Sequence, residues 1–263
     1  MDPALRAAAS GMMAQQTRTE VIANNLANVN TTGFKRSRAQ FEDLLYQNVQ
    51  NAAVIGAPES QTTPAVQIGR GTRLTAVTRT HAQGTLERTD RPMDVAIEGE
   101  GFFQVQLGQG QLAYTRDGSF QISDQGVLVT SEGYTVQPSI RIPNDATTVS
   151  ISRTGVVTAT RGNDASKPQE IGRLELARFV NPAGLMTQGQ NLYTATAASG
   201  ETQTGFPQDD GMGTLVQGSL EGSNVEIVQE MVDMITAMRA YEINSKAIKN
   251  SEDMLEIADN LVK

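Results

Sequence analysis

The sequence predicts an α+β protein in which long amino- and carboxyl-terminal helices pair as a coiled coil around an inserted, mainly antiparallel β-domain. Apolar residues recur every three or four positions at both ends of the chain, whereas they alternate every second position through the middle. These two periods belong to helices and strands respectively. A polar, irregular stretch between the first helix and the alternating region predicts an extended linker or hairpin.

The amino-terminal helix is predicted within residues 1–45. Asp2 before Pro3 is a typical helix start, because proline at the first helical position loses no hydrogen bond. Gly33 is expected to end the regular helix in a left-handed conformation, and residues 34–46, FKRSRAQFEDLLY, are interpreted as its basic and then amphipathic tail. A heptad seam, imperfect at Gln15 and Thr19, follows the start: Leu5, Ala8, Met12, Gln15, Thr19, Ile22, Leu26 and Val29.

Residues 46–72 lack a helical period and contain Pro58 and Pro64, which predicts an extended loop or irregular hairpin. Residues 73–198 are predicted to form a β-rich outer domain, of the sandwich or barrel type, because short alternating runs are separated by turn residues. The runs lie at 74–80, 94–98, 103–107, 149–152 and 174–179. Residues 199–216, rich in Gly, Thr and Asp, are expected to return the chain to the last helix.

The carboxyl-terminal helix is predicted within residues 217–263. Ser223 followed by Glu226 forms a capping-box pattern, and neither Gly nor Pro interrupts residues 225–263. At 1.5 Å per residue such a helix could reach about 58 Å. One apolar stripe runs along it: Ile227, Met231, Met234, Met238, Tyr241 and Ile248. So long a helix cannot bury this stripe by itself and needs a partner.

The two ends carry opposite charge, which favours their pairing. Residues 1–40 hold five basic and two acidic residues, whereas residues 221–263 hold four basic and nine acidic residues. Exposed ion pairs contribute only about 0–1 kcal/mol each, so charge assists the apolar seams without replacing them. The alternative is that both helices pack separately on one globular core.

Composition argues against several functional classes. The net charge of −8 disfavours nucleic acid as the main partner, and Lys35, Arg36 and Arg38 are interpreted as a solvated turn. With no cysteine and only His81 as imidazole, the chain lacks the ligands of a zinc site, and no glycine-rich nucleotide loop is present. No cofactor is therefore expected. The sequence has no apolar run of about 18 residues, so no membrane-spanning segment is predicted. No cleavable signal pattern is expected at its amino terminus.

Two terminal motifs resemble the bacterial flagellar rod and hook axial proteins. They are ANNLANVNTTGFKRS at residues 23–37 and SNVEIVQEMVDMITAMRAYEINSKAIKNSEDML, which begins at Ser223. GFFQVQL at 101–107 and AYTRDGSFQI at 113–122 are similar to the β-domain of this family. The segment that ends in QIGRGTRL resembles the extra stretch of the members that build the distal rod. The resemblance covers nearly the whole chain.

The resemblance implies a structural subunit and no enzyme: a helical homopolymer that forms a rigid, hollow drive shaft, transmits torque to the hook and carries the export channel. Its implied location is the basal body, from periplasm to outer membrane, after export from the cytoplasm by the type III apparatus without a cleaved signal. The implied partners are other copies of the chain, proximal rod proteins, the hook protein, the L- and P-ring proteins, the export apparatus and the rod cap.

The resemblance also implies which residues make subunit contacts. On the first motif these are Asn24, Asn25, Leu26, Asn28 and Gly33. On the last helix they are Ile227, Met231, Met234, Met238, Arg239, Tyr241, Glu242, Asn244 and Ile248. In the stretch expected to stiffen the rod they are Tyr46, Gln67, Ile68, Gly69 and Gly71.

Alternative functions remain open at this point. A proximal rod protein or a short hook protein of the same family would share both terminal motifs. From other classes, a secreted peptidoglycan hydrolase could use carboxylate pairs such as Asp90 with Asp94 or Asp209 with Asp210. A trimeric coiled-coil fibre or adhesin would form a small closed oligomer, whereas a rod protein would be mostly monomeric until it polymerises.

Overall fold

The computed structural model describes residues 3–50, 53–55, 61–63, 66–161, 168–209 and 211–262. The chain divides into two units. Unit 1 comprises Met1–Leu26, Ser37–Thr78 and Glu226–Lys263, and unit 2 comprises Ala27–Arg36 and Arg79–Val225. Each unit is therefore built from segments that lie far apart in the sequence, as expected for a β-rich insertion between two terminal helices.

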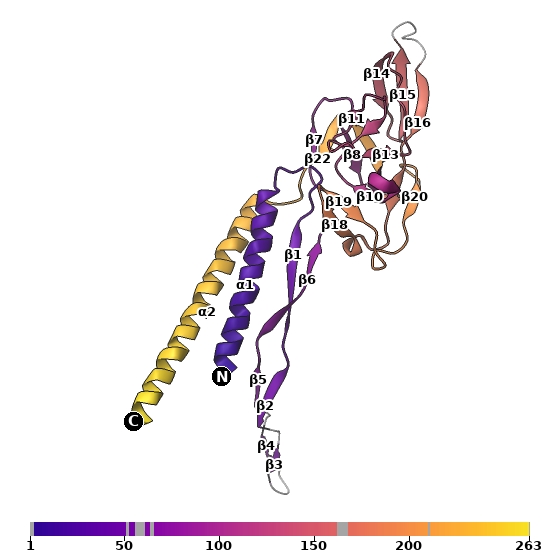
Figure 1. Ribbon diagram of the computed structural model, residues 1–263. Helices are drawn as coiled ribbons and strands as arrows, with labels where there is room; N and C mark the ends of the chain where they lie inside the picture. Colours follow the sequence, from indigo (N-terminus) through magenta and orange to yellow (C-terminus); the bar gives the residue numbers. More distant parts are fainter. Residues whose placement is uncertain are drawn as a thin grey trace. The chain divides into compact units, whose positions relative to one another are not determined.

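Unit 1 contains two long helices and a β-hairpin (Figure 1). Helix α1 (Pro3–Ala27) and helix α2 (Ile227–Val262) run side by side in opposite directions. The hairpin pairs β1 (Ser37–Asp43) with β6 (Thr72–Arg79). Farther out, antiparallel pairs join β2 (Tyr46–Gln50) to β5 (Val66–Gly69) and β3 (Ala53–Ile55) to β4 (Gln61–Thr63). Within the predicted stretch 46–72, the residues that the structure describes form these antiparallel pairs, and residues 51–52, 56–60 and 64–65 lie outside the described part.

The first helix is shorter than predicted. It ends at Ala27, and residues 37–43, interpreted from the sequence as its tail, form strand β1. The run of Asn and Thr before Gly33 explains the early stop, because these side chains compete with the helical hydrogen bonds and favour turns. Pairing with β6 then satisfies the backbone of residues that looked amphipathic.

Unit 2 is the β-rich unit, and its strand pairs are antiparallel. Its largest sheet has nine strands. Along that sheet lie β11 (Gln121–Ile122), β12 (Leu128–Val129), β13 (Thr135–Gln137), β9 (Phe102–Gln106), β10 (Leu112–Thr115), β19 (Leu192–Thr194) and β18 (Met186–Gly189). Strand β17 (Leu176–Arg178) pairs with both β9 and β20 (Gln203–Gly205). Short 3-10 turns occur at Gly108–Gly110 and Pro182–Gly184.

Smaller sheets complete unit 2. One joins β14 (Ala146–Ile151), β15 (Val156–Arg161) and β16 (Gln169–Arg173). Two pairs join β8 (Val95–Glu98) to β21 (Thr214–Gln217) and β7 (Leu86–Arg88) to β22 (Ser219–Glu221). The predicted return linker thus contributes strand β21 to the fold. Its residue Leu215 is buried and completes the core beside β8.

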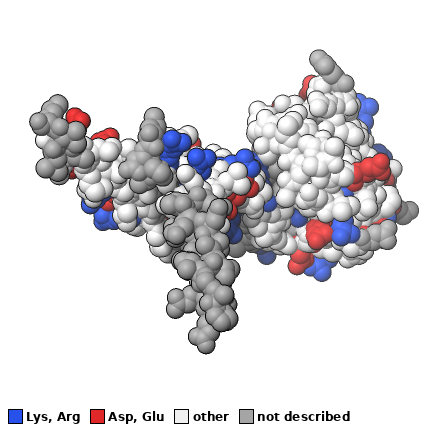
Figure 2. All heavy atoms as spheres, turned by 90° about the horizontal axis from the view of Figure 1, so that it is seen from below, with Lys and Arg blue, Asp and Glu red and all other residues white. Residues whose placement is uncertain are grey.

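The core of unit 2 lies between these sheets. Its large aliphatic and aromatic side chains come mostly from the alternating runs: Val95, Ile97, Phe103, Val105, Leu174 and Leu176. Phe120 and Leu215, which lie outside those runs, complete it. A second aromatic cluster holds Phe102, Tyr114, Phe179 and Tyr193 in edge-to-face contacts. On the visible face, basic and acidic side chains are interspersed among uncharged residues (Figure 2).

Candidate assembly interface

Helix α2 exposes many large apolar side chains in the single chain. Met231, Met238 and Tyr241, which belong to the predicted stripe, are 52%, 47% and 43% exposed. A second row beside them is also exposed: Val228, Val232, Ile235, Ile243, Met254 and Ile257, while Leu255 is exposed on another side of the helix. Most of these residues lie between Ile227 and Ile243, and large apolar side chains exposed close together mark an interaction site. We call the exposed apolar residues of α2 the α2 face.

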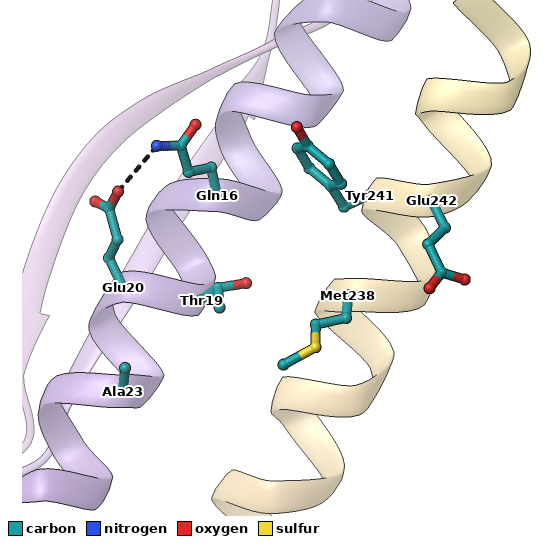
Figure 3. A pocket seen from close by; sticks show the side chains of 7 residues that line it. All are labelled: Gln16, Thr19, Glu20, Ala23, Met238, Tyr241 and Glu242. Atoms are coloured by element: carbon teal, nitrogen blue, oxygen red, sulfur yellow. Dashed lines mark hydrogen bonds between the residues drawn. The ribbon is translucent and has the colours of Figure 1, made fainter.

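A groove of about 510 Å³ separates α1 from α2 within unit 1 (Figure 3). Met238 and Tyr241 extend from α2 toward α1, where the small side chains of Thr19 and Ala23 leave room. Gln16, Glu20 and Glu242 line the rest of the groove, and the Gln16 amide donates a hydrogen bond to Glu20. The groove is therefore apolar at its centre and polar at its rim, which is the usual layout of a protein-binding surface.

Polar contacts connect the two helices beyond the groove. The Arg18 guanidinium lies 3.2 Å from the Asp233 carboxylate in a partly exposed ion pair. Nearer the carboxyl end of α1, the side-chain amide of Asn25 donates to the Glu230 carboxylate at 3.1 Å and to the Ser37 backbone carbonyl at 2.9 Å. The side-chain carbonyl oxygen of Asn25 accepts from the Ser37 backbone amide. Asn25 and Glu230 are fully buried, so this asparagine ties α1, α2 and β1 together inside one chain.

The other residues predicted at the first motif have different surroundings. Asn24 is exposed, and Leu26 and Asn28 are half-buried. Gly33 has a φ of +68°, as expected for a left-handed residue, but it lies six residues beyond the end of α1 and belongs to unit 2. The structure therefore separates this motif into a helical part in unit 1 and a turn in unit 2.

The remaining predicted residues of α2 divide into exposed and partly covered ones. Ile227 is exposed, whereas Met234 and Ile248 are half-buried. Arg239 and Glu242 are exposed and pair with each other at 3.0 Å along the helix. Half-buried Asn244 lies close to Gly11 of α1, where a Cβ would come within 2.9 Å of the asparagine amide nitrogen.

The contact that Ser223 makes before α2 differs from the predicted capping box. The Ser223 hydroxyl accepts from the Val225 amide at 3.3 Å, two residues along, and α2 begins at Ile227. Ser223 therefore stabilises the turn before the helix.

Residues of the predicted stiffening stretch lie along the hairpin. Tyr46, Gln67 and Ile68 are exposed, and Gly69 packs against the Tyr46 ring. Gly71 lies at the base of the outer hairpin with a φ of +110°, and its carbonyl accepts from the Leu44 amide at 2.9 Å. The next residue, Thr72, donates its amide to the Ser10 hydroxyl of α1 at 3.2 Å. This contact attaches the hairpin to α1.

A buried ion cluster in unit 2 was not predicted. Lys35 is completely buried and donates to the Glu221 carboxylate at 2.5 Å, so its interpretation as part of a solvated turn is wrong. Arg116 donates to the same carboxylate at 3.2 Å, and the Gly84 amide donates to it at 2.9 Å. Burial lowers the pKa of Lys35, while the adjacent Glu221 carboxylate opposes that shift.

The same cluster joins residues near the two ends of the chain. The Gly33 amide donates to the Glu221 carbonyl at 2.7 Å. Asn224 accepts from the Arg36 amide at 2.7 Å and donates to the carbonyls of Thr80 and Ala82. Sequence reasoning missed these residues because nothing in a single sequence shows that Lys35 and Glu221, 186 positions apart, are partners.

Two further properties concern the described residues only. None of their helices is long and apolar enough to cross a membrane. No group of three or more His, Asp or Glu side chains among them is placed to hold a metal ion. His81 is a packing residue, in edge contact with the rings of Phe102 and Tyr193.

Three family models match successive parts of the chain. Residues 5–35 match "Flagella basal body rod protein", residues 96–159 match "Flagellar hook protein FlgE/F/G D1 domain", and residues 216–261 match "Flagellar basal body rod FlgEFG protein C-terminal". The first and last matches include most of α1 and most of α2, which form the groove.

Relatives match over almost their full length. The chain is 51% identical to the flagellar basal-body rod protein FlgG of Borreliella burgdorferi, over 98% of both chains. It is 48% identical to the protein of that name in Agrobacterium fabrum, over 99% of both chains. It is 46% identical to that of Caulobacter vibrioides, again over 98% of both chains.

Proposed function

Because the chain belongs to the flagellar basal-body rod protein family, we propose that it is a subunit of the distal rod that polymerises through its two terminal helices. The family consists of structural flagellar proteins, so the chain is a structural component and not an enzyme. The alternative function as a secreted peptidoglycan hydrolase is therefore no longer supported.

The observation that carries this proposal is the α2 face. Its exposed apolar rows are costly in water, since each buried square ångström of apolar surface contributes roughly 25 cal/mol. A second copy of the chain can cover them by packing a helix of its own over α2, with side chains entering the groove that Met238 and Tyr241 line. In the polymer, the helices would then pack as the predicted coiled coil.

Charge favours contacts between unlike helices of neighbouring copies. Helix α1 carries Arg6, Arg18 and Glu20, a net charge of +1, whereas α2 carries seven acidic and three basic residues. Two α2 helices would repel each other, while α2 of one copy attracts α1 of the next. Contact between two different surfaces is heterologous, and a heterologous contact whose rotation does not close produces a helical filament.

The hairpin supports the expected rigidity of such a filament. Its base is attached to α1 through Ser10 and Thr72, and its exposed residues Tyr46, Gln67 and Ile68 are available to a neighbouring copy. We assign the bridge between neighbouring subunits to this hairpin. Such a bridge would make the rod stiff, whereas a hook without it would bend. This assignment favours a distal rod subunit over a proximal rod or short hook protein.

The setting of the polymer follows from the proposal. A hollow rod would carry the export channel and transmit torque from proximal rod proteins to the hook protein. It would span the periplasm and outer membrane inside the L- and P-rings. The subunits would reach the growing end, beneath the rod cap, through the type III export apparatus without cleavage.

Substituting Met238 by Asp tests this proposal. Met238 is about half exposed in the single chain, so the charge should leave folding unchanged but prevent the groove from being covered. We expect monomers in sedimentation velocity under conditions in which the parent chain polymerises, together with loss of rods in electron micrographs of basal bodies. The matched control is Met186→Asp, an exposed methionine of unit 2. Parent-like polymerisation of Met238→Asp would contradict the proposal.

A further inference from the structure

Unit 2 contains a cavity of about 210 Å³ that the assembly interface does not use. His81, Phe102, Arg116 and Phe179 line it together with Glu100 and Arg178. All of these residues belong to unit 2, whereas the groove and the α2 face belong to unit 1. The cavity is smaller than the roughly 300–1,000 Å³ of sites that hold drug-sized ligands, so its volume suits a single small group.

Arg116 brings an incompletely satisfied charge to this cavity. Its side chain is only 4% exposed. One terminal nitrogen donates to Glu221 at 3.2 Å, and the other donates to the Gly99 carbonyl at 2.7 Å. Its Nε is buried, and within the part of the chain that the structure describes it has no hydrogen-bond partner. Because this Nε is buried and both terminal nitrogens are engaged, Arg116 contributes its positive charge to the cavity and no free donor.

The surrounding charges also favour an anion. Lys35 and Arg116 both pair with Glu221, so two buried cations share one buried carboxylate. Burial, followed by the charges of Lys35, Arg116 and Arg79, lowers the pKa of His81 to about 4, so the imidazole is neutral at pH 7. The cluster therefore retains a surplus positive charge beside the cavity.

The walls of the cavity select for a compact group. The rings of Phe102 and Phe179 meet edge-to-face with centroids 5.8 Å apart, and the Arg116 guanidinium lies 5.4 Å from the Phe102 centroid. Arg178 and Glu100 form a more exposed ion pair at 2.9 Å in the same lining. The Arg178 guanidinium lies in the same lining as these aromatic rings, and a guanidinium matches the planar geometry of a carboxylate.

We propose that this cavity is a recognition site for a carboxylate group, in which Arg178 is the binding residue and the buried charge of Arg116 strengthens the attraction. The site would work independently of rod polymerisation, because every residue that forms it lies in unit 2.

The test uses the full-length chain with ¹³C-labelled histidine. His81 is the only histidine of the sequence, so its ring signal reports on the cavity without overlap. Acetate is the probe, and acetamide, which has the same shape without the charge, is its control. Acetate should shift the His81 signal in a saturable way and raise the pKa of His81, because a bound anion stabilises the imidazolium. Acetamide should do neither.

Three variants separate recognition from a general effect of charge. Arg178→Gln should weaken acetate binding about tenfold, the loss expected for one charge-assisted hydrogen bond. Glu100→Gln should strengthen it, because a competing carboxylate disappears from the lining. Arg161→Gln, on β15 and outside the cavity lining, should leave it unchanged.

Four results would each overturn the proposal. They are a His81 signal that does not respond to acetate, an equal response to acetamide, a saturable response to phosphate but not to acetate, and acetate affinities that are the same in Arg178→Gln and the parent chain.

Discussion

At the scale of single residues, Gly33 combines a positive φ with close backbone neighbours. A Cβ at this position would lie 2.8 Å from the Asp117 nitrogen and 2.9 Å from the Arg116 carbonyl carbon. These backbone atoms directly follow β10 and cannot move aside cheaply, so an added methyl group meets both dihedral strain and a clash. Gly33 therefore stabilises unit 2 directly, and the prediction that it ends the first helix is wrong, because α1 ends at Ala27.

Replacing Gly33 by Ala should lower the free energy of unfolding of unit 2 by about 3 kcal/mol, of which about 1–2 kcal/mol comes from the left-handed backbone. Gly133→Ala is the matched control, because Gly133 has a φ of +89° and nothing within 4 Å of its added Cβ. Urea unfolding followed by circular dichroism measures both. Equal losses in the two variants would show that the close neighbours of Gly33 do not matter.

His81 should make unit 2 sensitive to moderate acid. The folded chain holds its pKa near 4, first through burial and then through the nearby cations, whereas the unfolded chain has the ordinary value of 6.5. Between these values the unfolded state binds more protons, so stability falls as the pH drops from about 6.5 toward 4. At pH 4.5 the loss should reach roughly 2–3 kcal/mol.

The measurement compares urea unfolding of the parent chain and His81→Gln at pH 7.0, 5.5 and 4.5. Titrating carboxylates contribute equally to both proteins, so the difference between them isolates the imidazole. The variant should lose less stability on acidification. Parallel pH profiles would rule out this role of His81.

At the scale of elements, the hairpin depends on a glycine where it meets α1. Gly71 has a φ of +110°, and a Cβ there would lie 2.1 Å from the Ser10 hydroxyl oxygen and 3.2 Å from the Ala7 Cα. Only glycine permits this close approach, which allows the Thr72 amide to reach the Ser10 hydroxyl.

Gly71→Ala should therefore release the base of the hairpin from α1 while leaving unit 2 intact. Hydrogen exchange should show faster exchange of the Leu44 and Thr72 amides in this variant, and rods assembled from it should bend more easily in electron micrographs. Gly69→Ala is the control, because its added Cβ would make an ordinary 3.5 Å contact with the Tyr46 ring. Unchanged exchange in Gly71→Ala would contradict this attachment.

At the scale of the whole molecule, the two units differ in how completely they bury their apolar residues. Unit 2 has an extensive core, whereas α2 in unit 1 exposes much of its apolar surface. Segments with few buried contacts open at low free energy and are cleaved first. Packing against other copies would supply the missing burial, which couples the ordering of unit 1 to assembly.

Limited proteolysis of the soluble chain should remove α1, the hairpin and α2, and leave a resistant core of residues 79–225. This core extends to Val225 because β21 and β22 pair with β8 and β7. The peptide 27–36 should stay bound to it without a covalent link, through the Gly33 amide and Lys35. Native mass spectrometry would detect this nicked complex. Uniform resistance of all segments would show that unit 1 needs no partner.

Much of the fold could be predicted because local periodicity reflects local geometry. The stripe from Ile227 to Ile248 predicted a helix, and the alternation at 94–98 and 103–107 predicted strands where β8 and β9 occur. Strand β1 could not be predicted in this way, because FKRSRAQFEDLLY fits an amphipathic helix equally well. Its pairing with β6, which begins 29 positions after β1 ends, decides its conformation.

The sequence by itself determined the family, the helical ends and the β-rich middle of this protein, because long motifs and periods are local properties of the chain. Only the tertiary structure decided that Lys35 is buried against Glu221, that Asn25 is bonded within its own chain, and that Arg116 borders a cavity. Charged and polar side chains have no intrinsic preference for one partner. Their roles depend on which distant groups the fold brings within hydrogen-bonding distance.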